Sequence, residues 1–254
     1  MTESRIDLAV IGGTGLYRLA ALDDARGEAV RTPYGEPSGP VRVGRLGAVT
    51  VAFLARHGED HGIPPHRVNY RANLWALRSL GAGRVLAVNA VGGITDPWAP
   101  QAIGVPDQII DYTWGRVSTL CEEPGTEVLH VDMGEPYTPA LRKDLLAAAR
   151  RAGVAVVDGG CYGATQGPRL ETRAEIARLR RDGCDLVGMT GMPEAGLARE
   201  LGLDYACLAL VANWAAGCGD QAEITLEEVY ANLEAATAPV PAIVRALLGE
   251  QPGG

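Results

Sequence analysis

The hydrophobic positions of this chain fall into a unit that recurs four times. In each copy a helix-like stretch ends at a glycine, and a run of β-branched or apolar residues follows. A glycine directly after a helix readily takes the left-handed conformation that caps the helix C-terminus. The four copies predict helices over 72–80, 141–152, 171–181 and 193–201, and strands over 85–88, 154–157, 186–187 and 205–211.

Strands that alternate with helices indicate an α/β fold. The run Cys207–Ala212 is almost continuously apolar, as expected of a strand that is covered on both faces. Two earlier strands are expected at Asp7–Ile11 and Val49–Leu54. The sequence therefore predicts a mixed, largely parallel sheet flanked by helices.

The stretch 225–248 also has a helical pattern. Thr225 and Glu228 have the spacing of a capping box, and Pro239 and Pro241 are expected to interrupt the helix. The chain has 254 residues, 47% of them hydrophobic, which is ample for one sizeable core. No composition break or low-complexity linker divides it, so we expect a single domain over residues 1–254.

Charge and composition argue against several classes of partner. The formal net charge of −8 disfavours a nucleic-acid partner, because such proteins carry a basic face. No apolar run approaches the ~20 residues that a membrane span needs. The apolar stretch Ile6–Val10 is too short for the core of a signal peptide. We therefore expect a cytoplasmic protein without a membrane partner.

Cysteine and histidine spacing does not predict a metal centre. The five cysteines are widely spread, and none forms a CxxC pair, so a disulfide framework or a metal site is not expected. His57, His61 and His66 lie close together, but on a loop that prolines interrupt. The carboxylates and cysteines elsewhere lack zinc-ligand spacing, which leaves zinc as a weak alternative.

Two predicted loops have features of an anion site. Ligands of such sheets bind beyond the carboxyl ends of the strands. The glycines of Gly12–Leu16 let backbone N–H groups approach an anion, and Thr14 adds a hydroxyl donor. A dinucleotide fingerprint is incomplete, because Arg18 stands at its third glycine position.

Arg56 and His57 follow the strand Val49–Leu54, and an arginine fork suits phosphate. A plain tight turn and a solvated surface arginine are the alternatives.

Other loops expected at this edge carry polar groups that suit a purine. They hold a carboxylate at Glu171, a hydroxyl at Thr190 and a carboxamide at Asn213. An ionised carboxylate only accepts hydrogen bonds, whereas a carboxamide donates and accepts. A 6-oxopurine has a donor at N1 and acceptors at O6 and N7. Glu171 and Asn213 therefore match this base.

Taken together, these motifs resemble the trimeric purine nucleoside phosphorylase and methylthioadenosine phosphorylase family. The match runs along nearly the whole chain in the same order. The resemblance implies an α/β fold, a homotrimer, and phosphorolysis of a purine nucleoside with inorganic phosphate as co-substrate and no metal or organic cofactor. The segments that carry it are 12–16, 56–58, 68–73, 89–93, 167–169 and 189–194.

The resemblance also implies roles for individual residues. Phosphate is expected to be held by Thr14, Arg56, His57, Ala90 and Thr190. We take Asn213, which stabilises the leaving base at N7, and His57 as the catalytic residues.

Three further residues are expected around the nucleoside. Met189 is expected to pack on the ribose, and His130 resembles the residue that family members contribute to a neighbouring subunit's site. A satisfied surface or interface histidine is the alternative for His130. Leu170 stands where the family normally has Phe, so it is expected to contact the base with weaker stacking.

The residues that distinguish branches of the family point to an unusual nucleoside. Methylthioadenosine phosphorylases usually have Ser and Asp where this chain has Glu171 and Asn213, and inosine and guanosine phosphorylases have Glu and Asn. Facing adenine, Glu171 meets the N1 lone pair, and such unmatched buried polar pairs are rejected. Leu226 stands where inosine enzymes place a histidine for the 5′-hydroxyl, which suits a methylthio group instead. Ordinary helix packing is the alternative for Leu226.

The sequence therefore predicts phosphorolysis of S-methyl-5′-thioinosine. A methylthioadenosine phosphorylase and an inosine or guanosine phosphorylase remain as alternatives within the family. A nucleotide-binding oxidoreductase lacks the fingerprint. A purine-binding sensor without catalysis is the alternative outside enzymes, but a protein that only binds nucleoside needs no phosphate site.

Overall fold

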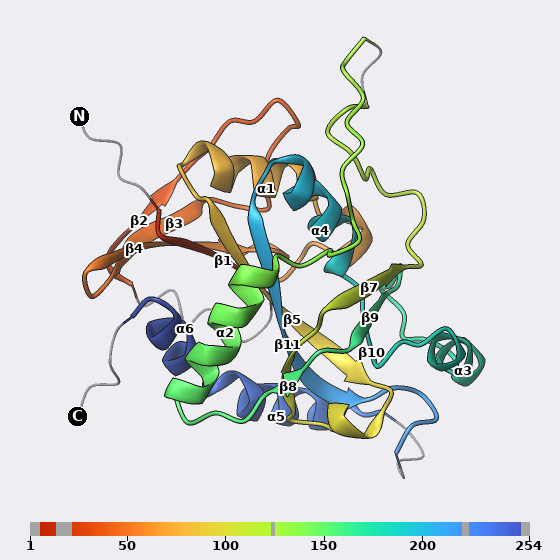
Figure 1. Ribbon diagram of the computed structural model, residues 1–254. Coiled ribbons are helices and arrows are strands. Elements are labelled where there is room, and N and C mark those ends of the chain that lie inside the picture. Colours follow the sequence, from red (N-terminus) through yellow and green to blue (C-terminus); the bar gives the residue numbers. More distant parts are fainter. Residues whose placement is uncertain (1–5, 14–21, 123–124, 220–223, 250–254) are drawn as a thin grey trace.

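The computed structural model describes residues 6–13, 22–122, 125–219 and 224–249, and its described strands join in one mixed sheet (Figure 1). The parallel pairings are β1 with β4 and β5, β5 with β11, β9 with β7 and β10, and β6 with β8. Antiparallel pairings join β2 with β3, β3 with β4, β10 with β5 and β11 with β6. The predicted fold, mixed and largely parallel, is confirmed.

The described strands are β1 (Leu8–Gly12), β2 (Asp23–Glu28), β3 (Val41–Leu46), β4 (Val49–Ala55), β5 (Arg84–Gly93), β6 (Ile103–Val105), β7 (Gln108–Asp111), β8 (Val157–Asp158), β9 (Cys161–Ala164), β10 (Leu186–Gly188) and β11 (Asp204–Trp214). The described α-helices are α1 (Tyr70–Ser79), α2 (Pro139–Arg151), α3 (Arg173–Arg181), α4 (Gly191–Glu200), α5 (Leu226–Thr237) and α6 (Val240–Leu247). Two 3-10 turns, η2 (Pro65–Arg67) and η3 (Asp96–Trp98), complete the described elements.

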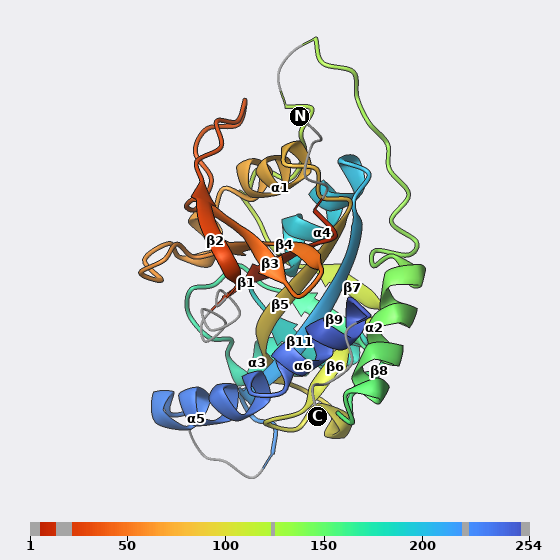
Figure 2. The ribbon, with the colours of Figure 1, turned by 90° about the vertical axis from the view of Figure 1, so that its left-hand side faces the viewer.

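Helices cover both faces of the sheet, as the buried strands require. One core cluster joins α1 and α4 to one set of strand residues, and a second joins α2, α5 and α6 to the alternate set. Figures 1 and 2 show α1 and α4 together above the sheet, and α2, α5 and α6 around its other side. None of the helices in the described ranges is long and apolar enough to cross a membrane.

Most predicted element boundaries shift by one or more residues, and the shifts in β5, β11, β8 and α3 are described here. β5 and β11 are longer than expected, so Ala90 and Asn213 are strand residues and not loop residues. The strand expected over 154–157 shrinks to β8, because only its last residue pairs with β6. The helix expected from 171 starts at Arg173, because Thr172 is its N-cap and accepts from Glu175 N.

The C-terminal helix is interrupted where the prolines predict. α5 ends at Thr237, and α6 starts at Val240 after Pro239. The Thr225 side chain caps α5 by accepting a hydrogen bond from Glu228 N at 3.3 Å. This cap and break turn the chain so that both helices pack on the core shared with α2.

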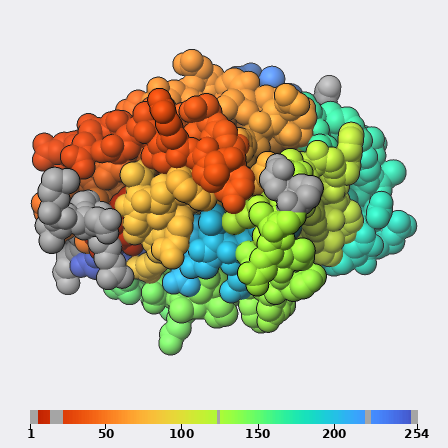
Figure 3. Space-filling model, turned by 90° about the horizontal axis from the view of Figure 1, so that it is seen from above, coloured from red at the N-terminus to blue at the C-terminus, as the bar shows by residue number. Residues whose placement is uncertain are grey.

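A long irregular segment connects β7 to α2 and leaves the body of the protein (Figure 1, yellow-green to green). It also touches α4: the backbone N–H of Leu120 donates to Glu200 at 2.7 Å, and Arg199 donates to the carbonyl of Glu135. Figure 3 shows the segment as a ridge beside α4. It exposes the apolar residues Val128 and Leu129, whose surfaces are 66% and 43% accessible to solvent.

Candidate active site

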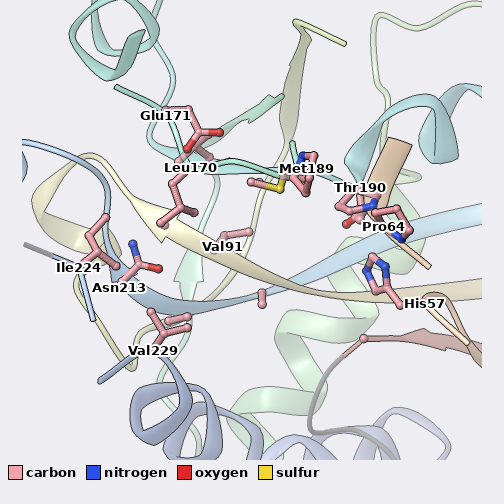
Figure 4. Close-up of a pocket in the computed structure, with 18 of the residues that line it drawn as sticks. His57, Pro64, Val91, Leu170, Glu171, Met189, Thr190, Asn213, Ile224 and Val229 are labelled. Carbon is pink, nitrogen blue, oxygen red and sulfur yellow. The ribbon is translucent and has the colours of Figure 1, made fainter. Parts of the chain in front are cut away.

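A cavity of about 610 Å³ opens where β4, β5, β10 and β11 reach their carboxyl ends. Figure 4 shows its polar residues at two ends, with His57 and Thr190 at one and Glu171 and Asn213 at the other. Met189 lies between them. The lining also includes Gly13, Arg56, Ala90 and Leu170. The edge of the sheet that the sequence selected is therefore the edge that holds the cavity.

Arg56 reaches this cavity from a buried network. Its Nε and Nη2 donate to the two carboxylate oxygens of Glu194 at 2.8 Å each, and Nη2 also donates to Asn89 Oδ1 at 3.0 Å. Nη1 donates to the carbonyl of Val88 at 3.2 Å. Burial lowers the pKa of Arg56, but the facing carboxylate outweighs burial and raises it overall. Its charge is therefore permanent, and the second N–H of Nη1 is the donor that these contacts leave for an anion.

His57 faces the cavity as a neutral imidazole. Its Nδ1 lies 2.8 Å from the carbonyl oxygen of Ile63, which can only accept, so Nδ1 carries the proton. Burial, and then the charge of Arg56, lower the pKa of His57 to about 4. Nε2 is left as an acceptor, which can receive a hydrogen bond from a protonated phosphate oxygen or from a sugar hydroxyl.

The lowered pKa of His57 makes stability depend on pH. Between about pH 6.5 and about pH 4 the unfolded chain binds a proton at this residue and the folded chain does not. The contribution of neutral His57 to the free energy of unfolding is therefore complete above pH 6.5, and it is lost as the pH falls toward 4. We expect His57→Gln to flatten this decline, measured as urea midpoints at several pH values. An unchanged slope in the variant would contradict the assignment. Burial also lowers the pKa of His61. This residue remains in the variant, so its own contribution to the slope remains as well.

At the other end of the cavity Glu171 is fixed through one carboxylate oxygen. Thr165 Oγ1 donates to Glu171 Oε1 at 2.6 Å, and Thr165 N donates to the carbonyl of Gly188 at 2.8 Å. The loop after β9 is thereby tied to the end of β10. The carboxylate can present its other oxygen to the cavity, which Glu171 lines.

Asn213 lies on a bulge in β11. Val211 pairs with Val91 of β5 and Asn213 pairs with the next residue, Gly92, so that Ala212 is the additional residue. The amide nitrogen of Asn213 donates to the carbonyl of Trp214 at 2.7 Å, which identifies the nitrogen end, because only the NH2 group donates. A side chain at Gly92 would approach this nitrogen to 3.5 Å. At this distance the added carbon would only contact the carboxamide.

Apolar side chains form the wall beside Asn213. Ile224 and Val229 lie next to it in Figure 4, and both line the cavity. Leu226 does not line the cavity that a single chain forms: it begins α5 and is 70% exposed. The apolar character expected from Leu226 is supplied by Ile224 and Val229, and a role for Leu226 itself remains a prediction.

The other predicted residues divide into three groups. Thr190, Ala90, Met189 and Leu170 all line the cavity, and Ala90 is exposed between buried neighbours of β5. His130 is exposed on the segment between β7 and α2 and is not part of this lining. Thr14 lies outside the described residues, although Gly13 lines the cavity.

Sequence reasoning gave no role in the site to His61 and Glu194. His61 lines the cavity with its ring centroid 4.8 Å from that of His57, although its loop suggested only a weak zinc alternative. Glu194 belongs to a segment that carried the family resemblance, but nothing in the sequence pairs it with Arg56. Within the described ranges, no three His, Cys, Asp or Glu side chains are grouped so as to hold a metal ion.

Comparison with known proteins places this geometry in a family. The model of the phosphorylase superfamily matches residues 7–249. The chain belongs to the phosphorylase superfamily. This membership confirms the resemblance drawn from the motifs.

Several phosphorylases are similar over almost the whole chain. A protein of Xanthomonas campestris pv. campestris named "Probable S-methyl-5'-thioinosine phosphorylase" is 66% identical over 244 residues, 96% of this chain and 98% of that protein. The "6-oxopurine nucleoside phosphorylase" of Pyrococcus furiosus is 48% identical, covering 87% and 84% of the two chains. The solved structure of methylthioadenosine phosphorylase from Schistosoma mansoni in complex with adenine has a TM-score of 0.91 at 32% identity, covering 96% of this chain and 91% of that one.

Proposed function

We propose that this phosphorylase cleaves S-methyl-5′-thioinosine with phosphate to hypoxanthine and 5-methylthioribose 1-phosphate. The observation that carries the proposal is the pairing of Glu171 with Asn213 at the cavity end where Ile224 and Val229 form an apolar wall. A carboxylate can accept from N1–H of hypoxanthine, and a carboxamide can donate to N7. The name of the 66% identical relative from Xanthomonas campestris supports the same substrate.

Phosphate is proposed to bind at the end of the cavity that holds Arg56, His57, Ala90 and Thr190. Arg56 supplies a permanent positive charge and one N–H, and neutral His57 supplies an acceptor for the protonated oxygen of monohydrogen phosphate. Only 7% of the surface of Thr190 is exposed to solvent, and the residue lines the cavity. Its hydroxyl can complete the set of donors. Inorganic phosphate is thus the proposed co-substrate, and no metal or organic cofactor is proposed.

The proposed reaction exchanges one bond at C1′. A phosphate oxygen forms a bond to C1′ while the bond from C1′ to N9 breaks, and the electron pair leaves with the base. Asn213 donates to N7 as negative charge grows there, and the proton released by the phosphate neutralises the departing base. A donor aimed at charge that develops only in the transition state raises the rate, because it stabilises that state more than the bound substrate.

An ordinary inosine phosphorylase is the second candidate, favoured by His61. Its ring lines the cavity beside His57, where an imidazole can hydrogen-bond a 5′-hydroxyl. The apolar residues Ile224 and Val229 favour the methylthio group instead. The two candidates thus differ at the 5′ substituent and agree on the base.

One assay tests the proposed function and its alternatives. Purified protein is incubated with phosphate and, separately, with methylthioinosine, methylthioadenosine and inosine, and the free base is quantified by chromatography. We expect rapid release of hypoxanthine from methylthioinosine and little from inosine. Adenine release as the fastest reaction contradicts the role of Glu171. If inosine is the best substrate, His61 is assigned the contact with the 5′-hydroxyl. If the protein releases no base in the presence of phosphate, the result supports a purine-binding sensor.

The protein is also proposed to act as a cytoplasmic homotrimer. The segment between β7 and α2 presents Trp114, Val128 and Leu129, which are 73%, 66% and 43% exposed. Large exposed apolar side chains on one projecting segment are typical of a protein interface. His130 is exposed on the same segment, so a neighbouring copy is the partner whose site it can reach.

A further inference from the structure

Arg116 lies outside the cavity lining and contacts both loops that carry site residues. Its Nη1 donates to the carbonyl oxygens of Met189 at 2.8 Å and Met192 at 2.7 Å. Its Nη2 donates to those of Thr165 at 3.1 Å and Gln166 at 2.7 Å. One half-buried guanidinium therefore binds four backbone carbonyls, two on the loop after β9 and two where β10 leads into α4.

Further contacts fix the guanidinium in its plane. Nε donates to Gln166 Oε1 at 3.1 Å, and the same oxygen accepts from the backbone N–H of Trp114 at 3.1 Å. Nη1 lies 3.3 Å from the hydroxyl of Tyr70, and the guanidinium carbon lies 5.7 Å from the centroid of that ring. The planar, multiply donating shape of arginine is what allows one side chain to satisfy acceptors on several sides.

The two loops hold different parts of the site. The first, after β9, contains Leu170 and Glu171 at the base end of the cavity. The second, after β10, contains Met189 and Thr190, which line the middle and the phosphate end. Four carbonyl dipoles that point at one spot repel each other unless a cation lies between them. Without Arg116 the two loops keep the hydrogen bond from Thr165 N to the Gly188 carbonyl, but they lose the cation that binds both of them further from the strands.

The connection from Arg116 to the base runs through Thr165. The carbonyl of Thr165 accepts from Arg116, and its hydroxyl donates to Glu171 Oε1 at 2.6 Å. On the other loop Arg116 binds the carbonyl of Met189, the residue before Thr190. A shift of the guanidinium therefore moves the base-binding carboxylate relative to the residues at the sugar and phosphate.

We propose that Arg116 is a positioning residue that sets the distance between the base-binding loop and the loop of Met189 and Thr190. It touches no substrate and acts through Thr165 and Met189. The effect on catalysis rests on the proposed function, whereas the restraint on the two loops does not. Misplacement of reacting groups by about 1 Å can lower a rate by about 10²-fold.

The test compares Arg116→Met with Arg142→Met. Arg142 is a matched control, because it also donates to two backbone carbonyls, of Pro106 at 2.9 Å and Val105 at 3.0 Å, but away from the cavity lining. Amide hydrogen exchange is followed by mass spectrometry in peptides covering 163–172 and 187–193. We expect both peptides to exchange faster in Arg116→Met and to remain unchanged in Arg142→Met. Unchanged hydrogen exchange of these peptides in Arg116→Met overturns the proposal, regardless of which nucleoside the enzyme cleaves.

Kinetics of the same variants show whether the restraint serves catalysis. We expect Arg116→Met to lower kcat/KM for the best nucleoside by about 10²-fold. The preference for 6-oxo over 6-amino purines should also narrow, which a purely structural role leaves unchanged. Arg116→Lys should recover part of the lost kcat/KM and part of the lost selectivity. The kcat/KM of Arg142→Met should stay within about twofold of that of the parent. An equal loss in Arg142→Met, or unaltered selectivity in Arg116→Met, overturns the catalytic part. Failure of the parent to release any base instead contradicts the proposed function alone.

Discussion

Replacing Asn213 with alanine is expected to lower kcat by about 10²–10³-fold, the usual loss when one preorganised donor to a developing negative charge is removed. The bulge in β11 and the contact with Trp214 hold the carboxamide before the substrate arrives, so little reorganisation is needed during the reaction. Because the side chain is only partly buried, the free energy of unfolding should change by about 1 kcal/mol. Single-turnover release of the base and urea unfolding measure the two quantities.

Asn232 offers a matched control for this prediction. It is a half-buried asparagine on α5 whose amide nitrogen donates to the carbonyl of Ala212 at 3.0 Å, next to Asn213 in sequence, yet it does not line the cavity. Asn232→Ala should therefore cost similar stability and leave turnover near that of the parent. If Asn213→Ala retains most of its turnover, or if both variants lose it equally, Asn213 does not stabilise the leaving base.

Replacing Glu194 with glutamine is expected to lower the free energy of unfolding by about 3–5 kcal/mol, because it leaves a buried charge without its partner. The side chains of Arg56 and Glu194 are 1% and 0% exposed, and their closest atoms are 2.8 Å apart. Tyr205 also donates to Glu194 Oε1 at 2.9 Å, so the carboxylate organises a wider buried network. Thermal and urea unfolding measure the loss.

Two comparisons separate burial from charge pairing. The surface pair of Arg84 and Asp144 has side chains 33% and 62% exposed, so Asp144→Asn should cost less than about 1 kcal/mol. The double variant Arg56→Met with Glu194→Leu removes both buried charges and should regain part of the stability, without regaining turnover. Equal losses for Glu194→Gln and Asp144→Asn would show that the buried pair is not special.

Much of the fold follows from local signals in the sequence. A glycine after each helix and an apolar run after each glycine locate α1 to α4 and the strands that follow, since both signals lie within one unit. The break between α5 and α6 follows from Pro239. The ends of β5 and β11 were placed too early, because Asn89 and Asn213 resemble loop residues. Their polar side chains are accommodated by Arg56 and by the cavity, which are contacts made far away in the sequence.

The site was predictable in its residue types and not in its internal contacts. Arg56 and Glu194 are separated by 138 positions, and no sequence pattern indicates that they pair. Arg116 gives no signal either, because four of its partners are backbone carbonyls, which every residue has. Ile224 and Val229 were missed because the apolar wall depends on how α5 lies against β11. Local motifs thus identify which loops matter, whereas tertiary packing decides what each side chain does there.

The additional residue in β11 determines the face of the sheet on which Asn213 is found. Neighbouring residues of a strand point to opposite faces, so strict alternation places Asn213 with Val211, in the core that α1 and α4 cover. By pairing with Gly92 it instead shares the side of Ala90, toward α5 and Val229. If the bulge were absent and Ala212 paired with Gly92, Asn213 would pair with Gly93, and its carboxamide would turn away from the cavity. The bulge in β11 therefore matters to the chemistry as much as the asparagine itself.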